Sequence, residues 1–229
     1  MNQSPLSPKI LLENRHLIII DKPAGMLSIL GRLGINDPRP CVLTWFRLER
    51  KINVLPIHRL DCEVSGLMIL AKRPEVQTII TPWFAKKMIN KSYSALTEGT
   101  ACEDWVAGRT KFFWESRIER GKKRAYEHKD GKIAITEAVW IGHYKVRATD
   151  PSGTVSPGLL HWRLSPKTGR SHQLRYELAK QGFPIAGDTL YGAQVREDNK
   201  NVALRAVEID FTACPGAKSL GLPPFIELE

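Results

Sequence analysis

The chain has 229 residues, of which 42% are hydrophobic and 25% are charged. These values are ordinary for globular proteins, so they exclude a peptide-like scaffold and a wholly disordered chain. Lysine and arginine exceed aspartate and glutamate by 34 − 24 = 10. This excess favours nucleic acid as the partner, although an anionic membrane or simple solubility also explains it.

Hydrophobic patterning predicts short strands, separated by turn signals, and three helices. The strands are expected at residues 17–20, 67–71, 91–96, 134–141, 143–149, 159–164 and 203–211, and the helices at residues 42–51, 74–84 and 172–181. Strands cluster instead of alternating regularly with helices, so the predicted fold class is α+β with a largely antiparallel sheet and flanking helices and loops.

No apolar stretch approaches the roughly 20 residues that a transmembrane helix needs. The first residues show no basic segment followed by an apolar one, so no secretory signal is expected. The four cysteines contain no Cys-x-x-Cys pair, which disfavours a zinc ribbon or a thioredoxin-like site and favours reduced thiols. We therefore expect a cytoplasmic protein.

Residues 109–132 form the densest basic segment, with nine lysines or arginines against four acids. Aromatic residues are interleaved with these charges, namely Phe112, Phe113, Trp114 and Tyr126. The segment is either a solvated hairpin or loop, or an arm that contacts phosphates and stacks on bases. The two interpretations are compatible.

Two further segments carry residues suited to chemistry. Asp61 follows His58 and Arg59 in a loop before the strand at 67–71, where a rigid element can hold a reacting group; a structural ion pair or a turn cap is the alternative. Residues 169–175 are basic at the start of a predicted helix, which suits either an anion site or a capped helix. The glycines form no phosphate-binding Gly-x-x-x-x-Gly-Lys loop, so a nucleotide triphosphatase is excluded.

Five motifs, in order along the chain, resemble those of the RluA-type RNA pseudouridine synthases. They are IIIDKPAGMLSI (18–29), HRLDCEVSGLMILAK (58–72), KSYSAL (91–96), TGRSHQLRYELAKQGFPIAGDTLYG (168–192) and LRAVEIDF (204–211). The likeness spans residues 10–215 and is greatest to the RluA subgroup, whose first motif also continues as the segment at 27–32. The resemblance implies the pseudouridine synthase fold, with a tail at 1–9, a catalytic domain at 10–229 and no appended N-terminal RNA-binding domain.

The resemblance also implies a reaction. A uridine in structured RNA leaves the base stack, its glycosidic bond breaks, and the uracil turns and rejoins the ribose through carbon. The implied partner is tRNA, large-subunit rRNA or both, with neither a metal nor a cofactor, no membrane, and a monomeric enzyme.

Five residues match positions of the family's site. Asp61 matches the essential aspartate, a nucleophile or a base, and Arg175 matches the arginine that pairs with it and favours its ionised form. Tyr93 matches the tyrosine that stacks on the target base, unless it is an ordinary strand aromatic. Arg59 matches the residue that fills the gap left by the flipped nucleotide, with a phosphate contact as the alternative, and Leu204 matches an apolar residue of the target pocket, with plain core as the alternative.

Val64 and Arg205 depart from the family pattern, which usually has threonine and histidine there, and both bear on substrate preference more than on the reaction.

A catalytically idle RNA-binding or ribosome-assembly module is the runner-up function. The intact Asp61, Tyr93 and Arg175 argue against it. An RNA hydrolase or glycosidase lacks an evident second carboxylate in the motifs.

Overall fold

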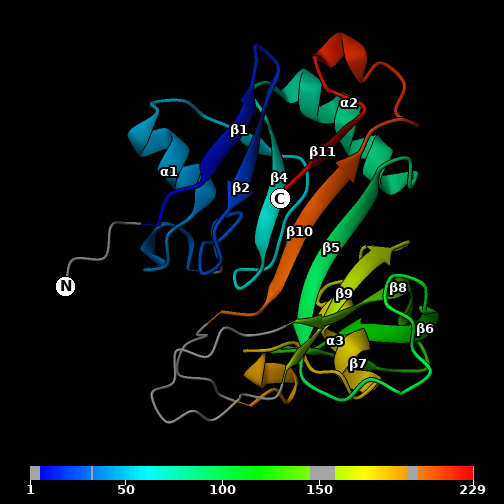
Figure 1. The fold of residues 1–229 in the computed structure, drawn as a ribbon. Coiled ribbons are helices and arrows are strands. Elements are labelled where there is room, and N and C mark those ends of the chain that lie inside the picture. Colours follow the sequence, from blue (N-terminus) through cyan, green and yellow to red (C-terminus); the bar gives the residue numbers. More distant parts are fainter. Residues whose placement is uncertain (1–5, 32, 145–157, 195–200, 229) are drawn as a thin grey trace, which may run out of the picture. The chain divides into compact units, whose positions relative to one another are not determined.

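The computed structural model describes residues 6–31, 33–144, 158–194 and 201–228, and these contain eleven strands and three α-helices. The chain divides into two compact units (Figure 1). Unit 1 comprises residues 1–91 and 205–229, and unit 2 comprises residues 92–204. No helix among the described residues is long and apolar enough to cross a membrane.

Unit 1 is built on a mixed sheet with the strand order β1-β2-β4-β10, in which β3 also pairs with β4 and β11 with β10. All these pairs are antiparallel except the parallel pair of β4 and β10. The strands are β1 (Lys9–Glu13), β2 (Leu17–Lys22), β3 (Leu55–Pro56), β4 (Ser65–Ala71), β10 (Leu204–Asp210) and β11 (Phe225–Glu227). The helices are α1 (Val42–Glu49) and α2 (Pro74–Ala85), with 3-10 turns η1 (Gly34–Asn36) and η3 (Lys218–Leu220).

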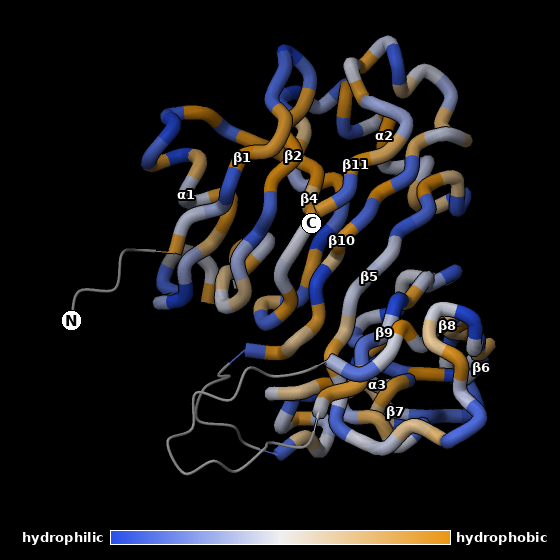
Figure 2. Tube along the Cα trace, in the orientation of Figure 1, coloured by the Kyte–Doolittle hydropathy of each residue, from blue (hydrophilic) through white to orange (hydrophobic). Residues whose placement is uncertain are grey.

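The core of unit 1 forms around β2 and β4, whose apolar runs are almost entirely buried. Hydrophobic residues of β2 are coloured orange in Figure 2. Side chains alternate between the two faces of a strand, so Ile18 and Ile20 share one face and pack with Val42 and Phe46 of α1. Each such fully buried side chain contributes roughly 1.5 to 3 kcal/mol relative to an exposed one. The α1 helix is thereby fixed against the sheet.

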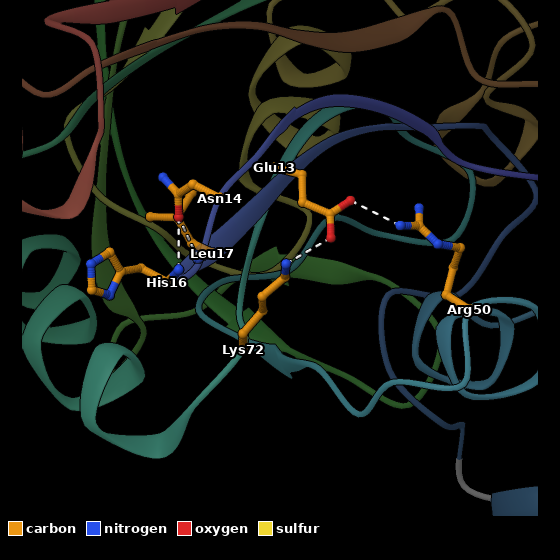
Figure 3. A network of polar contacts seen from close by, with 6 residues as sticks. All are labelled: Glu13, Asn14, His16, Leu17, Arg50 and Lys72. Carbon is orange, nitrogen blue, oxygen red and sulfur yellow. Dashed lines mark hydrogen bonds and ion pairs between the residues drawn. The ribbon is translucent and has the colours of Figure 1, made fainter.

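The turn between β1 and β2 is stabilised by polar side chains (Figure 3). Asn14 Oδ1 accepts the backbone N–H groups of His16 (2.8 Å) and Leu17 (3.0 Å), which closes the turn. The Glu13 carboxylate accepts hydrogen bonds from Lys72 Nζ (2.6 Å) and Arg50 Nη2 (3.0 Å). The Lys72 hydrogen bond is the main cause that lowers the pKa of Glu13.

Unit 2 is an antiparallel sheet with the order β5-β9-β8-β6-β7. Its aromatic core centres on the fully buried Trp162, which Trp105, Phe112 and Phe183 contact with ring centroids 5.2 to 5.6 Å away. The helix α3 lies against β6, β7 and β8. The elements are β5 (Asn90–Thr97), β6 (Lys111–Arg120), β7 (Ala125–Glu127), β8 (Lys132–Tyr144), β9 (Leu159–Pro166), α3 (Gln173–Lys180) and η2 (Thr189–Tyr191).

These elements confirm the α+β class and the largely antiparallel sheet. The expected helix at 42–51 ends two residues early, at Glu49, and the strands expected at 134–141 and from 143 onward are one continuous strand, β8, through Tyr144. Residues 145–149 of that second expected strand lie outside the described residues. Part of the basic segment at 109–132 forms the antiparallel strand pair β6 and β7, which agrees with the hairpin form of the first interpretation.

Candidate functional site

The loop that carries Asp61 is bound to the segment 23–29 on both sides of the aspartate. Ser28 Oγ donates to the carbonyl of Leu60 (2.7 Å) and accepts its N–H (3.0 Å). The N–H of Gly25 donates to the carbonyl of Cys62 at 2.8 Å. The backbone groups of both neighbours of Asp61, Leu60 and Cys62, are thus held by hydrogen bonds, while the aspartate itself stays partly exposed.

Lys22 is a third connection in this loop, and it is fully buried. Its Nζ donates to the carbonyls of Met26 (2.7 Å), Pro23 (2.9 Å) and Cys62 (3.3 Å). Burial lowers the pKa of Lys22 to about 8, although nearby acidic groups, Asp61 among them, oppose this shift. An ammonium group offers three N–H donors, which matches the three carbonyls. Lys22 therefore has a structural role, because it connects the first motif to the loop that carries Asp61.

His58 holds the start of the same loop against β4. Its Nε2 accepts the backbone N–H of Ile69 at 3.1 Å, and its ring stacks on Phe84 of α2 with centroids 4.8 Å apart. Desolvation, with a smaller contribution from Lys91, lowers the pKa of His58 to about 3. The ring is neutral at physiological pH, as an acceptor nitrogen requires. The next residue, Arg59, is exposed and so is accessible to a large ligand.

Arg205, one of the two residues that depart from the family pattern, lies at the start of β10 beside this part of unit 1. Its Nη2 donates to Asp21 Oδ2 at 2.7 Å, and its backbone pairs with Ser65 at the start of β4. The arginine therefore forms an ion pair with the residue next to Lys22. Val64, the other departure, is buried in the core of unit 1.

Arg175 of α3 is buried in unit 2 and is oriented by Asp188. Arg175 Nε lies 2.7 Å from Asp188 Oδ2, and Nη2 lies 2.8 Å from Oδ1. The side chains of the two residues are only 3% and 1% exposed. Such a bidentate pair fixes the plane of the guanidinium group as well as its position. Asp188 was not among the residues expected at the site, although it lies in the quoted motif at 168–192.

Tyr191 supports the same arginine from a second side. Its ring centroid lies 5.4 Å from Arg175 Cζ. The Tyr191 hydroxyl accepts the N–H of Ala125 in β7 at 2.7 Å and lies 3.1 Å from His172 Nδ1. Burial raises the pKa of Tyr191, so the hydroxyl stays protonated near neutral pH. Tyr191 thereby connects the basic strand pair to the arginine, through a hydrogen bond to β7 and a cation–π contact with Arg175.

Gln173 fixes the loop that enters α3. Its Oε1 accepts hydrogen bonds from Thr168 Oγ1 (2.8 Å) and the Arg170 N–H (3.0 Å), and its Nε2 donates to the Ile135 carbonyl (2.9 Å). His172, at the N-cap, has a φ of 55° and makes no side-chain cap. Gln173 is therefore a structural residue of the motif, and it binds the loop to β8.

Tyr93 and Leu204 are both buried, with exposed fractions of 8% and 4%. Tyr93 lies in β5 opposite Leu164 of β9. Asp61 and Arg59 belong to unit 1, whereas Tyr93, Arg175 and Leu204 belong to unit 2. The pairing of Asp61 with Arg175 would join the two units, so it stays a prediction, as do the five assigned roles.

Comparison with known proteins places these motifs in one family. Residues 16–180 match the family model described as RNA pseudouridylate synthase. The tRNA pseudouridine synthase C of Vibrio vulnificus is 31% identical over 88% of this chain and 79% of its own. The dual-specificity RNA pseudouridine synthase RluA of the same organism is 30% identical over 89% of this chain and 77% of its own.

A solved structure supports the expected fold. Human RNA Pseudouridylate Synthase Domain Containing 1 superposes with a TM-score of 0.68 at 21% sequence identity, covering 92% of this chain and 81% of the human one. The pseudouridine synthase fold and the resemblance to the RluA type, both expected from the motifs, are confirmed. The chain belongs to the RNA pseudouridylate synthase family.

Proposed function

We propose that this protein isomerises specific uridines to pseudouridine in tRNA, large-subunit rRNA or both. The observation that carries the proposal is the fixed loop around Asp61, held by Lys22, Gly25 and Ser28 in a member of this family. Two similar relatives have names that specify tRNA or dual specificity, which supports these two RNA classes as substrates.

In the proposed reaction Asp61 acts as the nucleophile or the base that initiates cleavage of the glycosidic bond. Arg175, which Asp188 orients, has the proposed role of favouring the ionised form of Asp61. Tyr93 stacks on the flipped uracil, and Leu204 packs against the same pocket. Arg59, which is exposed, enters the space that the nucleotide leaves in the RNA.

The reaction rearranges atoms within one nucleotide, so its balance needs no co-substrate, and we propose that it uses neither metal nor cofactor. The enzyme acts as a monomer in the cytoplasm. The basic balance of the chain supplies the attraction for RNA, because phosphate contacts by lysine and arginine dominate such binding.

The test is pseudouridine formation by the purified protein on unmodified tRNA and rRNA transcripts, mapped at single-nucleotide resolution. Asp61→Asn should abolish product while RNA affinity is retained. Glu63→Gln is the matched control, since it removes a carboxylate from the same loop at an exposed position. Product formation by Asp61→Asn at the wild-type rate would refute the catalytic assignment. RNA binding without any product from the wild type would favour the idle module.

Mapping pseudouridine in the host after depletion of this protein identifies the natural target. Sites that vanish on depletion and return only with the wild type, and not with Asp61→Asn, are its substrates.

A further inference from the structure

A pocket of about 490 Å³ lies in unit 2, and none of the residues assigned to the reaction lines it. Its walls are the end of β6, the turn that enters β8, and the loop 169–171 that precedes α3. The strands β6 and β8 pair with each other, and α3 contacts both (Figure 1). The pocket thus joins the basic segment at 109–132 to the start of the motif that contains Arg175.

The charged side chains that line the pocket are three cations and two carboxylates. Arg120, Lys132 and Arg170 line it, together with Glu119 and Asp130. The turn at 122–124, which adjoins the pocket in sequence, adds two lysines and an arginine, all exposed. Wall and turn together carry six cations against two carboxylates.

The carboxylates of Glu119 and Asp130 both lie near the imidazole of His128. His128 Nδ1 lies 3.3 Å from Glu119 Oε2 and 3.9 Å from Asp130 Oδ2.

A hydrogen bond and a close backbone approach hold two parts of the pocket wall in place. Arg170 Nε donates to the carbonyl of Ile133 at 2.9 Å, which holds this side chain against β8. A Cβ on Gly131 would lie 2.8 Å from backbone atoms of Arg117 and Ile118, so only glycine allows the turn to approach β6 this closely. At Gly169 an added Cβ would meet nothing within 4 Å, because this residue faces open space.

The pocket is also coupled to the support of Arg175. β7, the partner of β6, donates the Ala125 N–H to Tyr191, and Tyr191 contacts both His172 and Arg175. His172 directly follows the loop 169–171. A ligand bound in the pocket therefore rests on the same framework that orients the candidate catalytic arginine.

We propose that this pocket binds the phosphodiester backbone of the substrate RNA at nucleotides that flank the target uridine. Arginine and lysine match the charge and the acceptor oxygens of a phosphodiester, and the volume accommodates a phosphate with part of its ribose. This proposal rests on the proposed function, since the RNA bound here is the substrate of the reaction. The pocket positions the RNA and takes no part in the chemistry.

The experiment measures the affinity for a fluorescein-labelled, unmodified tRNA transcript by anisotropy between 50 and 300 mM NaCl. The double variant Arg120→Gln/Lys132→Gln removes two cations from the pocket. The matched control, Lys9→Gln/Lys218→Gln, removes two exposed cations from unit 1 and changes the net charge equally. Thermal melts establish that both variants fold.

The pocket variant should weaken binding by about tenfold at 150 mM NaCl, and it should lower the slope of log affinity against log salt by about 1.4 to 1.8, as two lost phosphate contacts predict. The control should change affinity by less than about threefold. Conversely, Glu119→Gln/Asp130→Asn should strengthen binding, because it removes the repulsive charges of the pocket. Equal affinities and slopes for the pocket and control variants would overturn the proposal.

Pseudouridine formation by the wild type is measured separately. Its result distinguishes a failure of the pocket proposal from a failure of the proposed function. A wild type that forms no product while binding depends on the pocket would refute the function alone. A wild type that forms product while both double variants bind equally would refute the pocket alone.

Discussion

Removal of the Ser28 hydroxyl tests whether the first motif positions Asp61. Ser28 is only 4% exposed, and its Oγ both donates to and accepts from the buried backbone of Leu60, at 2.7 and 3.0 Å. Ser28→Ala leaves a buried N–H and a buried C=O without partners, and each costs about 1 to 3 kcal/mol. The free energy of unfolding should fall by roughly 2 to 6 kcal/mol. Asp61 directly follows Leu60 in the chain, so the loss of these hydrogen bonds should also displace the aspartate and lower kcat.

The matched control is Ser116→Ala, which removes the hydroxyl of a serine that is 5% exposed in unit 2 and accepts a hydrogen bond from Lys180. Urea unfolding gives the stability of both variants, and single-turnover pseudouridine formation at saturating RNA gives the rate. Ser116→Ala should lose stability and keep its rate. If Ser28→Ala loses stability but isomerises uridine at the wild-type rate, the hydrogen bonds to Leu60 stabilise the fold without positioning the aspartate.

Three further predictions concern the support of the site. Asp188→Asn should cost about 3 to 5 kcal/mol and most of the activity, because it removes the charge of the buried carboxylate that forms the bidentate ion pair with Arg175; an unchanged melting temperature and rate would contradict this. His58 is neutral in the folded protein with its pKa lowered to about 3, so the unfolded state binds the extra proton as pH falls below about 6.5. Stability should therefore drop by at most about 2 kcal/mol from pH 7 to pH 5, and urea midpoints of His58→Phe should lack this part of the pH dependence. Gly66→Ala should prevent stable folding, since at a φ of +110° its Cβ would lie 2.2 Å from a backbone oxygen of β10, whereas Gly182→Ala, with a φ of +86° and open space, should cost only about 1 kcal/mol.

The central strands could be predicted because they consist of continuous apolar runs, and such runs indicate burial without reference to distant partners. The apolar runs at 17–20 and 67–71 became β2 and β4, each of which is two residues longer than the run. The strands β1, β3 and β11 were missed for the opposite reason. They are two to five residues long and contain half-buried or exposed positions. Their strand character comes from pairing with a neighbour, which no local pattern reveals.

The site was predictable in its motifs but not in its contacts. Asp61 and Arg175 were identified by their motifs, while the roles of Lys22 and Asp188 depend on partners far along the chain. The Lys22 ammonium reaches the carbonyl of Cys62, 40 residues away, and Asp188 reaches Arg175 over 13 residues. Residue type alone does not specify such pairs. Both residues lay inside quoted motifs, and that position was the available signal.

The aromatic residues of the basic segment at 109–132 differ in exposure, and only an exposed ring is accessible for stacking on a base. Phe112 packs into the aromatic core, with its ring 4.9 Å from Trp105, whereas Phe113 is 63% exposed on the opposite face of β6. If the segment stacks on RNA bases, Phe113→Ala should weaken RNA affinity by about 1 to 3 kcal/mol per stacked base while leaving stability nearly unchanged.

Phe112→Ala is the matched control for that substitution. It should lower stability by about 2 to 4 kcal/mol through lost core packing, with the RNA affinity of the folded fraction retained. Anisotropy titrations and urea unfolding on the two variants separate these effects. Equal RNA affinity for Phe113→Ala and the wild type would restrict the role of the segment to its cations, because an exposed ring that no base contacts contributes nothing to binding.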